Sequence, residues 1–429
     1  MNVTVFGLGK IGLPLSVQYS KKGMNVFGVD TNAKVVELIN QAMVPFPGED
    51  NLSQYLNEVI SKNKLKAFSS GKNCVANSDV VIVAVPLFVS ENGDPDFIHL
   101  DEATREISLG LKKGTLVVYE TTLPIGTTRE RFARILREES GLEAGIDFSL
   151  AFSPERVSSG RIFSDLKKYP KIVGGISREC AEKAKIFYDT VLDFNDRPDL
   201  DRENGVWVMT NCEEAEFVKL AETTYRDVNI ALANQFAIFA NKIGIDIYAV
   251  IRAANSQTFS SIHMPGIAVG GHCIPVYPQL YLWKDENATL VRIARQVNAE
   301  MPKVIIQRLL FEWPNMNSTN VLILGASYRS GVKEVAYSGV FPIFRELVKL
   351  GANVEVFDTL YSVEELVELG FNPITDVRKI EVAIVQTNDE IYRNLLEDES
   401  SFPNLKVVVD GRNLFNGKFS TSHVRLISV

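Results

Sequence analysis

The chain has 429 residues, of which 46% are hydrophobic and 23% charged, the composition of a soluble globular protein with two or three domains. Its net charge is −8 and it contains no long basic run, so neither nucleic acid nor a membrane surface is expected as a partner. No apolar stretch reaches the length of a membrane span, and the four cysteines and four histidines lack metal or disulfide spacing, which predicts a cytoplasmic protein without a metal centre.

The first half of the chain alternates between predicted strands and helices. A short apolar strand, Asn2–Phe6, leads into the turn Gly7-Leu8-Gly9-Lys10-Ile11-Gly12 and a helix that ends near Lys22. A second strand, Asn25–Val29, ends at Asp30. This alternation is typical of a parallel sheet with helices on both faces. Further strands are predicted at Val80–Val85, Thr115–Tyr119, Phe148–Phe152 and Lys171–Val173.

The middle of the chain is predicted to contain one long helix. No Gly or Pro occurs from Asn211 to Lys242, Asn211 and Glu214 have the spacing of a capping box, and Gly244 is a natural stop. Such a helix would have about 32 residues and a length near 48 Å. A helix of that length usually connects domains or forms a dimer interface.

The pattern of the first half returns from Asn320. The spacing between the turn at Gly325 and the acidic strand end at Asp358 is similar to that of the first copy. We infer an internal repeat, and because the second copy lacks the full glycine set, we expect it to bind something other than a dinucleotide. The sequence therefore predicts an α/β protein with two Rossmann-like doubly wound parallel sheets joined by a long central helix. The strands of the second copy are predicted at Asn320–Leu324, Asn353–Phe357, Val382–Val385 and Lys406–Val409.

The glycine turn is the main evidence for a cofactor. Gly7, Gly9 and Gly12 directly follow a strand and open a helix, and Asp30 ends the next strand, 18 residues after Gly12. In such a turn the backbone approaches a pyrophosphate at the helix N-terminus, and the carboxylate accepts from the ribose 2′-hydroxyl. Since a carboxylate repels a 2′-phosphate, the pattern favours NAD over NADP, with a turn that binds nothing as the minor alternative.

Cys273 follows Gly270-Gly271-His272 on a glycine-rich turn. An unpaired cysteine is more often a small buried hydrophobe, but paired glycines indicate a close backbone approach to a ligand. Beside a nicotinamide site, an exposed thiol could hold an aldehyde as a thiohemiacetal so that a second hydride can leave. His272 could lower the pKa of the thiol, although a surface or packing histidine is the commoner case.

Three further residues are candidates with ordinary alternatives. Lys219 lies on the long helix, where a solvated lysine is the usual case. Glu155 lies just past a predicted strand end, where open α/β sheets bind ligands, although a surface carboxylate is commoner. Thr122 also follows a strand end and could belong to an ordinary turn.

Together these segments resemble the UDP-glucose/GDP-mannose dehydrogenase family over nearly the whole chain. The resemblance includes the N-terminal glycine turn and the Cys273 loop. The other matching motifs are Val83-Ala84-Val85-Pro86, Asn92-Gly93-Asp94-Pro95-Asp96, Glu120–Thr127, Ser153–Val157, Pro170–Gly175, Tyr225–Ala231, Leu324-Gly325 with Tyr328-Arg329, and Asp410-Gly411-Arg412-Asn413.

The resemblance implies an enzyme that oxidises the C6 hydroxyl of a nucleotide sugar to a carboxylate with two NAD. Cys273 would attack the intermediate aldehyde, Glu155 and Thr122 would position or activate the hydrolytic water, and Lys219 would stabilise oxyanions. The implied NAD contacts are Gly7, Gly9, Lys10, Ile11, Gly12, Asp30, Val85, Pro86 and Thr122. The implied substrate contacts are Lys219, Gly266, Gly270, Gly271 and Arg329, where Arg329 takes the place of a family lysine.

The resemblance also implies domains, a partner and a substrate class. We expect an NAD-binding domain at 1–205, a central helical domain at 206–315, a UDP-sugar-binding domain at 316–429, and a homodimer through the long helix. Glu120, Arg156-Val157 and His272–Val276 resemble the branch that acts on UDP-N-acetylhexosamines. UDP-N-acetylglucosamine and UDP-N-acetylmannosamine are both candidates, and their uronic acids usually enter surface polysaccharides.

Three positions depart from the family pattern. The family has an aspartate where this chain has Tyr277, an asparagine where it has Thr223, and an arginine where it has Ala336. An unperturbed phenol, with a pKa near 10, cannot replace a carboxylate base, and losing a general base costs on the order of 10²–10⁴ in rate. Two alternatives therefore stay open: two-electron chemistry on the same scaffold, or a protein that binds NAD and a nucleotide sugar without turnover.

Overall fold

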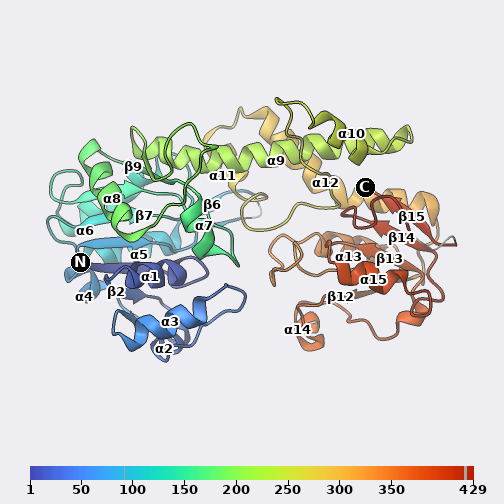
Figure 1. The fold of residues 1–429 in the computed structure, drawn as a ribbon, viewed down its shortest axis with the longest axis horizontal. Helices are drawn as coiled ribbons and strands as arrows, with labels where there is room; N and C mark the ends of the chain where they lie inside the picture. Colours follow the sequence, from blue (N-terminus) through green and yellow to red (C-terminus); the bar gives the residue numbers. More distant parts are fainter. Residues whose placement is uncertain (91, 420–422) are drawn as a thin grey trace. The chain divides into compact units, whose positions relative to one another are not determined.

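The computed structural model describes residues 1–90, 92–419 and 423–429. They form two compact units. The N-terminal unit comprises Met1–Glu222 with Gln279–Lys284, and the C-terminal unit comprises Thr223–Pro278 with Asp285–Val429. Each unit contains its own main sheet, drawn from blue to green in the first unit and in orange to red in the second (Figure 1).

An eight-stranded sheet forms the centre of the N-terminal unit, in the order β10-β9-β8-β7-β4-β1-β2-β3. Neighbouring strands from β3 to β8 are parallel, whereas β9 is antiparallel to β8, with Phe152 opposite Gly174. A separate hairpin pairs β5 (Phe88–Val89) with β6 (Pro95–Asp96). The strands of the main sheet are β1 (Asn2–Phe6), β2 (Asn25–Val29), β3 (Leu65–Phe68), β4 (Val80–Val83), β7 (Leu116–Tyr119), β8 (Ser149–Phe152), β9 (Lys171–Gly175) and β10 (Val206–Val208).

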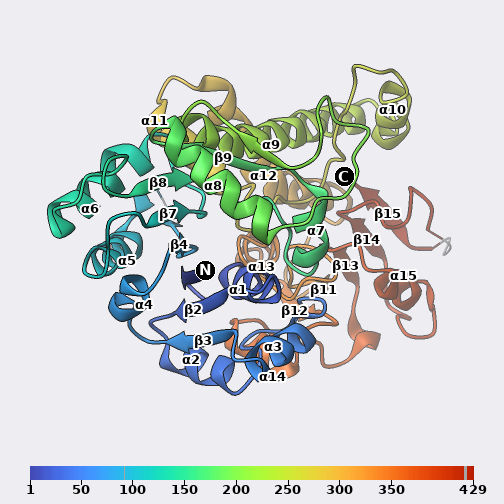
Figure 2. The same cartoon turned by 60° about the vertical axis from the view of Figure 1, so that its left-hand side comes forward.

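Helices cover both faces of this sheet. In Figure 2, α4, α5 and α6 lie on one side of the strands, and α1 and α8 lie on the other. Successive side chains of a strand point to opposite faces of the sheet, so apolar residues on both faces need helices to cover them. On one face Val83 belongs to a core cluster with Phe132. On the other face Val5 belongs to a cluster with Tyr19 and Tyr188. The helices are α1 (Gly12–Lys21), α2 (Ala33–Asn40), α3 (Leu52–Ser61), α4 (Lys72–Ala76), α5 (Ile98–Ser108), η1 (Thr128–Phe132), α6 (Ala133–Ser140), α7 (Ile162–Lys168) and α8 (Arg178–Val191).

The C-terminal unit contains a five-stranded parallel sheet in the order β12-β11-β13-β14-β15. Residues of α10, α12 and α13 form a core cluster with one face of the sheet, and α15 contributes to the cluster on the other face. The elements are α10 (Ile247–Ala254), α11 (Tyr277–Lys284, which crosses into the N-terminal unit), α12 (Thr289–Glu312), β11 (Asn320–Leu324), α13 (Val340–Lys349), β12 (Asn353–Phe357), α14 (Val363–Glu368), η2 (Val377–Lys379), β13 (Val382–Val385), α15 (Glu390–Glu397), β14 (Val407–Asp410) and β15 (Arg425–Ser428).

The two sheets repeat one local arrangement, which confirms the predicted internal repeat. In the first sheet, the amide of Gly7 donates to the last residue of β2 at 2.8 Å, and Asp30 accepts from the next amide at 2.8 Å. In the second, the amide of Gly325 donates to the last residue of β12 at 2.8 Å, and Asp358 accepts from the next amide at 2.8 Å. In both copies the acidic residue therefore fixes the turn that follows the first strand.

The predicted long helix is confirmed as α9 (Cys212–Lys242), which has 31 residues and contains the boundary between the two units. The Asn211 side chain accepts from the amide of Glu214 at 2.8 Å, which confirms the predicted cap, whereas the Glu214 carboxylate accepts from the amide of Thr210 and not from that of Asn211, as a capping box would require. Gly244 ends the helix with a φ of 72°. Among the described residues, neither α9 nor any other helix has the length and apolar content needed to cross a bilayer.

Each predicted strand is present, with ends that differ by at most two residues. Three strands at the sheet edges were not predicted. β3 has four residues and exposes Lys66, β10 has three residues with Trp207 half-buried, and β15 begins with the exposed Arg425. Edge strands of this kind lack the continuous apolar run that marks the central strands.

Candidate active site

The three glycines of the N-terminal turn have different functions. Gly7 has a φ of 85°, and a Cβ there would lie 2.9 Å from the carbonyl oxygen of Ala84. A Cβ on Gly12 would lie 1.8 Å from the carbonyl oxygen of Gly7. A Cβ on Gly9 would have no atom within 4 Å. The fold therefore requires Gly7 and Gly12, whereas Gly9 leaves the backbone accessible to a group that is not part of the chain, as a bound pyrophosphate requires.

Asp30 remains able to accept a further hydrogen bond beside this turn. It is half-buried, and its two carboxylate oxygens accept from the amides of Leu8 at 2.8 Å and Asn32 at 2.9 Å. A carboxylate has about four acceptor positions, so a ribose hydroxyl can still bind. The turn, Asp30 and the segment after β4 lie at the carboxyl ends of neighbouring parallel strands, and these residues fit NAD.

The other predicted NAD contacts lie at the same edge of the sheet. Lys10 and Ile11 are half-buried at the start of α1. Val85, which is half-buried, accepts at its carbonyl from the Thr121 hydroxyl at 2.6 Å, and Pro86 beside it is exposed.

Glu155 is held in a defined orientation, so its interpretation as a free surface carboxylate is wrong. Its side chain is 9% exposed. One carboxylate oxygen accepts from the amides of Arg156 at 2.7 Å and Val157 at 3.2 Å, and the other lies 2.9 Å from the ammonium of Lys171. Burial alone would raise the pKa of Glu155, but the Lys171 ammonium and the backbone amide lower it below its ordinary value.

A second carboxylate, Glu120, shares the same ammonium and is fully buried. Its Oε2 lies 2.7 Å from the Lys171 Nζ, and its Oε1 accepts from the hydroxyls of Tyr188 at 2.7 Å and Tyr19 at 3.0 Å. Burial raises the pKa of Glu120, and the negative charge of Glu155 raises it further against the opposing effect of Lys171. Lys171 therefore lies between Glu155, whose lowered pKa favours the anion, and Glu120, whose raised pKa makes it bind a proton more readily.

Lys219 and Thr122 are buried rather than solvated. The Lys219 side chain is 8% exposed, and its ammonium lies 3.4 Å from Glu222, which also accepts from Arg156 at 2.9 Å. The positive charge of Lys219 contributes to the lowered pKa of Glu155. Thr122 is 6% exposed at the end of β7. The N-terminal unit thus contains the glycine turn, Thr122, Glu155 and the first turns of α9.

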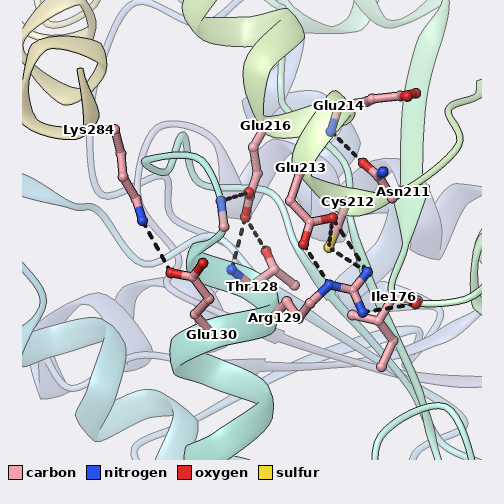
Figure 3. Close-up of polar contacts among 11 residues, drawn as sticks. Thr128, Arg129, Glu130, Ile176, Asn211, Cys212, Glu213, Glu214, Glu216 and Lys284 are labelled. Carbon is pink, nitrogen blue, oxygen red and sulfur yellow. Dashed lines mark hydrogen bonds and ion pairs between the residues drawn. The ribbon is translucent and has the colours of Figure 1, made fainter. Parts of the chain in front are cut away.

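Glu216, one turn before Lys219, anchors α9 to the loop after β7. Figure 3 shows its carboxylate pointing at the start of η1, where it accepts from the amide of Gly126 at 2.5 Å and from the amide and hydroxyl of Thr128 at 2.9 and 2.7 Å. Burial raises the pKa of Glu216 to about 7. The same figure shows Arg129 paired with Glu213 at 2.6 Å, a second link between η1 and α9.

Cys273 lies in the C-terminal unit and is the exposed member of the four free cysteines, whereas Cys74, Cys180 and Cys212 are buried. Its carbonyl accepts from the amide of Tyr277 at 2.9 Å, the first turn toward α11. The interpretation of Cys273 as a small buried hydrophobe is therefore wrong.

The glycines before Cys273 contact this chain itself. Gly271 has a φ of 91°, and a Cβ on Gly270 or Gly271 would lie 2.7 or 2.9 Å from Tyr328. A Cβ on Gly266 would lie 2.6 Å from the guanidinium of Arg412. These glycines let the loop pack closely on the segments that follow β11 and β14, and their contact with a substrate stays a prediction.

A buried polar network supports both sides of this loop. Asn298 on α12 donates to the carboxylate and carbonyl of Asp227 at 2.8 and 2.9 Å and accepts from Asn234 at 2.8 Å. Asn234 in turn accepts from the amide of Gly266 at 2.9 Å. Arg295 lies 3.3 Å from Asp227 and donates to the carbonyl of Ile274, the residue after Cys273, at 3.1 Å.

The remaining residues of interest lie in loops of the C-terminal unit. Arg329 is exposed, with its guanidinium 5.6 Å from the ring centroid of Tyr328. His272 pairs with Glu334. Arg412 donates to the carbonyl of Gln386 at 2.8 Å, and burial lowers its pKa to about 10.

Sequence analysis did not find Lys171, Glu216 or the network around Asp227. A charged residue at the first position of a buried strand, as in Lys171-Ile172-Val173, is the signal that could have indicated Lys171. No comparable signal exists for Glu216, because an acidic residue in the first turns of a helix is ordinary. The predicted site residues fall into two sets, one in each compact unit.

A mostly parallel sheet whose first strand leads through an open glycine turn into a helix, with an acidic residue at the end of the next strand, is typical of the NAD-binding proteins. Comparison with known families narrows this class. Residues 1–192 match the NAD binding domain of the UDP-glucose/GDP-mannose dehydrogenase family, residues 213–300 its central domain, and residues 322–417 its UDP binding domain. The chain belongs to this family and is an NAD-dependent oxidoreductase.

Individual relatives cover nearly the whole chain. The UDP-N-acetyl-D-mannosamine dehydrogenase of Pyrococcus horikoshii is 34% identical over 426 residues, with 96% of each chain aligned. The NDP-N-acetyl-D-galactosaminuronic acid dehydrogenase of Ralstonia solanacearum is 29% identical, with 97% of this chain and 96% of that chain aligned. The solved structure of the UDP-D-ManNAc dehydrogenase from Pyrococcus horikoshii superposes with a TM-score of 0.88 at 32% identity, covering 100% of this chain and 99% of that one.

Substitution of two glycines separates folding from cofactor binding. We expect Gly12→Ala to lower the thermal midpoint by more than about 4 °C, because its Cβ collides with a carbonyl oxygen in the turn. Gly9→Ala is the matched control, with open space for its Cβ. It should leave the midpoint without NAD unchanged and weaken NAD binding at least about tenfold, measured by calorimetry. Equal destabilisation by both changes would contradict this division.

The buried carboxyl of Glu216 should make stability depend on pH. Its pKa in the folded protein, about 7, exceeds its ordinary value of 4.5, so the folded state binds the proton more tightly than the unfolded chain. Its stabilising contribution is complete below about pH 4.5 and is lost as the pH rises through about 7. This corresponds to on the order of 2–3 kcal/mol between pH 5 and pH 8.

Glu216→Gln removes this dependence. The thermal midpoint of the native protein should fall by several degrees relative to that of Glu216→Gln between pH 5 and pH 8, measured by differential scanning calorimetry. Glu138→Gln, at a side chain 59% exposed, should follow the native curve. Parallel curves for the native protein and Glu216→Gln would show that the carboxyl does not titrate in this range.

Proposed function

We propose that the protein oxidises the C6 hydroxyl of a UDP-N-acetylhexosamine to a carboxylate in two hydride transfers, with Cys273 carrying the intermediate. The observation that carries the proposal is the exposure of Cys273 on a loop whose backbone is fixed on both sides, in a chain whose other cysteines are buried. A fixed and accessible sulfur is what a covalent nucleophile requires. NAD supplies a hydride acceptor when bound.

In the first half of the reaction, the C6 hydroxyl loses a hydride and a proton and becomes an aldehyde. The Cys273 sulfur then forms a C–S bond with the carbonyl carbon, and the carbonyl oxygen becomes the hydroxyl of a thiohemiacetal. Lys219 is our candidate for stabilising negative charge on that oxygen, because its buried ammonium provides a fixed positive charge.

In the second half, the thiohemiacetal loses a hydride and a proton and becomes a thioester. Water adds to the thioester carbon, the C–S bond breaks, and the acid and the free thiol result. Glu155 is our candidate for accepting the proton of that water, with Thr122 positioning it. Support comes from the location of both residues at the carboxyl edge of the N-terminal sheet and from the lowered pKa that keeps Glu155 ionised.

The substrate class rests on the relatives and on the C-terminal unit. Relatives that match the full chain are named as dehydrogenases of UDP-N-acetyl-D-mannosamine or as NDP-N-acetyl-D-galactosaminuronic acid dehydrogenases. We propose that residues 316–429 bind the UDP group with Arg329, that 1–205 bind NAD, and that 206–315 supply the nucleophile. The exposed guanidinium of Arg329 supports its role, because arginine suits phosphate oxygens.

Tyr277 favours a second candidate, a two-electron oxidation that stops at the aldehyde. Its amide donates to Cys273, so its side chain starts from the same turn as the nucleophile. A phenol there can donate to an oxyanion but is a weak base at neutral pH. This candidate predicts one NADH per sugar.

The stoichiometry of NADH distinguishes the two candidates. Purified protein with limiting UDP-N-acetylmannosamine or UDP-N-acetylglucosamine should produce two NADH per sugar, measured by absorbance with the product identified by mass spectrometry. Cys273→Ala should lower the rate of the second hydride transfer by at least about 10³, since it removes the covalent nucleophile.

Cys180→Ala, at a buried cysteine 1% exposed, is the matched control and should retain two NADH per sugar. One NADH per sugar, unchanged in Cys273→Ala, would establish the two-electron candidate. Binding of NAD and sugar nucleotide without any NADH would leave a binding protein.

We further propose a homodimer through the C-terminal half of α9. Exposed apolar side chains recur there at spacings of three and four residues, which places Leu232, Phe236 and Phe239 on one face of the helix. Exposed Tyr225, seven residues before Leu232, and exposed Ile243, just after the helix ends, continue the spacing. Phe239 is 60% exposed. An apolar helical stripe of this kind is self-complementary about a twofold axis, so a second copy of the chain is the occupant we propose.

The dimer can be tested at one residue. Phe239→Asp places a charge within the stripe, so it should convert a dimer of about twice the chain mass of 47.7 kDa into a monomer. Analytical ultracentrifugation at micromolar concentration measures the mass. Phe311→Asp is the matched control, on α12 with 83% exposure, and should leave the mass unchanged. A native protein that sediments as a monomer would refute the dimer.

We also propose the cytoplasm as the location of the reaction. All four cysteines are free thiols, and the role proposed for Cys273 needs a reduced sulfur.

A further inference from the structure

The strongest unassigned feature is the buried ammonium of Lys171 between two carboxylates. Nothing in the proposed reaction uses Lys171 or Glu120, yet both are almost fully enclosed, with side chains 5% and 0% exposed. Burying three ionisable groups is costly unless each stays paired. Lys171 also lies over the Tyr188 ring, 4.9 Å from its centroid. Such an arrangement calls for an explanation beyond the stability of the sheet.

The strand directions create this arrangement. Glu120 directly follows β7, and Glu155 follows the parallel neighbour β8, so both lie at the carboxyl edge of the sheet. Since β9 is antiparallel to β8, its first residue, Lys171, lies at that same edge. Continuing the β8–β9 register beyond Phe152 brings Glu155 opposite Lys171.

The two carboxylates differ in access to water. Glu155 is the more exposed of the two, at 9%, and is the one that a hydrolytic water can reach. Glu120 is enclosed by Lys171, Tyr19 and Tyr188, all within hydrogen-bonding distance. Glu155 is therefore the carboxylate that can take a proton directly from water, whereas Glu120 is shielded from it.

Without Glu120, protonation of Glu155 would leave Lys171 as an unpaired buried cation. A buried cation without a partner is strongly destabilising, so Lys171 by itself would make Glu155 a very weak proton acceptor. Glu120 changes this balance, because its carboxylate lies 2.7 Å from the same ammonium and stays in place when Glu155 becomes neutral. Glu155 can then take up a proton while Lys171 keeps one anionic partner.

We propose that Lys171 and Glu120 are positioning residues that make Glu155 usable as the proton acceptor of the hydrolytic step. Lys171 orients Glu155 and keeps it ionised, and Glu120 remains as the partner of Lys171 after the proton transfer. The inference rests on the function proposed for Glu155. The step is balanced: one O–H bond of water breaks, its proton goes to Glu155, its oxygen bonds to the acyl carbon, and the Cys273 sulfur leaves as the thiolate.

The proposal predicts opposite shifts from two substitutions. The charged and titratable groups that face the two carboxylates are Lys171 from β9, Tyr19 from α1, Tyr188 from α8 and Lys219 from α9. Removing a nearby like charge lowers the pKa of a carboxyl, and removing a nearby opposite charge raises it, typically by about one to three pH units.

The experiment measures thioester hydrolysis as a function of pH in the full chain. Rapid-quench samples with UDP-N-acetylmannosamine and NAD are analysed by intact-mass spectrometry, which detects the sugar bound to Cys273. Glu120→Gln should move the acidic limb of hydrolysis down by about one pH unit or more and slow hydrolysis at neutral pH at least about tenfold, so that thioester accumulates. Lys171→Met should move the limb up by a similar amount. Glu138→Gln, a matched substitution at an exposed carboxylate, should leave the profile unchanged.

The double variant Glu120→Gln/Lys171→Met provides an internal check. It removes both charges, so its acidic limb should lie between those of the single variants, and it leaves one carboxylate rather than two without Lys171, which lowers the risk that the variant fails to fold. If the cluster had only a structural role, both single variants would lower stability and rate, and the acidic limbs of their pH profiles would not move apart. An acidic limb of Glu120→Gln that coincides with the native limb, or shifts of both single variants in one direction, would overturn the proposal.

A second measurement does not depend on activity. The pKa of Glu155 can be followed by ¹³C NMR in protein labelled at glutamate carboxyls, with the signal assigned by its loss in Glu155→Gln. The pKa of Glu155 should fall in Glu120→Gln and rise in Lys171→Met. If native protein forms no NADH with any sugar nucleotide, the proposed function fails, and the NMR titration still decides whether the three groups share charge as proposed. If native protein is active and the titration shows no shift in Glu120→Gln, the inference alone fails.

Discussion

Parallel pairing in the N-terminal sheet brings the ends of β1, β2, β4, β7 and β8 to one edge, and the chemistry of the unit depends on that geometry. At this edge the backbone turns away from the sheet and leaves polar groups accessible. The glycine turn, Asp30, the segment at Val85, Thr122 and Glu155 all come from these turns. The antiparallel β9 is the exception that adds a cation, because its beginning rather than its end lies at the same edge.

The long helix α9 links the packing of this edge to the rest of the chain. Its first turns belong to the N-terminal unit, where Glu216 accepts from the loop after β7 and Lys219 contributes positive charge to Glu155. Its later turns belong to the C-terminal unit, where Asp227 and Asn234 support the Cys273 loop through α12. One helix therefore carries side chains that support the candidate residues of each unit.

Sequence patterns predicted those parts of the fold that depend on local regularities. Strand β1 with its glycine turn, the repeat at Gly325 and the cap of α9 at Asn211 follow from short-range rules of apolar periodicity and turn chemistry. The surroundings of Glu155 could not be derived in this way, because Lys171 is 16 residues away and reaches it only through the direction of β9. The same holds for Glu216, whose partner Thr128 is 88 residues distant. Burial of Lys219 likewise depends on tertiary packing, since its helical position alone favours exposure.

The pairing of Lys171 with Glu155 is set by the register of two adjacent strands and not by the segment that connects them. Residues between the end of β8 and the start of β9, including α7, run outside the sheet before the chain returns. The closure entropy of a connection grows only slowly with its length. Insertions or deletions in the part of this connection after Val157 would therefore leave the ammonium beside its carboxylate, whereas a slip of one residue within β9 would turn that side chain to the opposite face. Homologous chains can accordingly diverge in the later part of this connection while retaining the same charge arrangement.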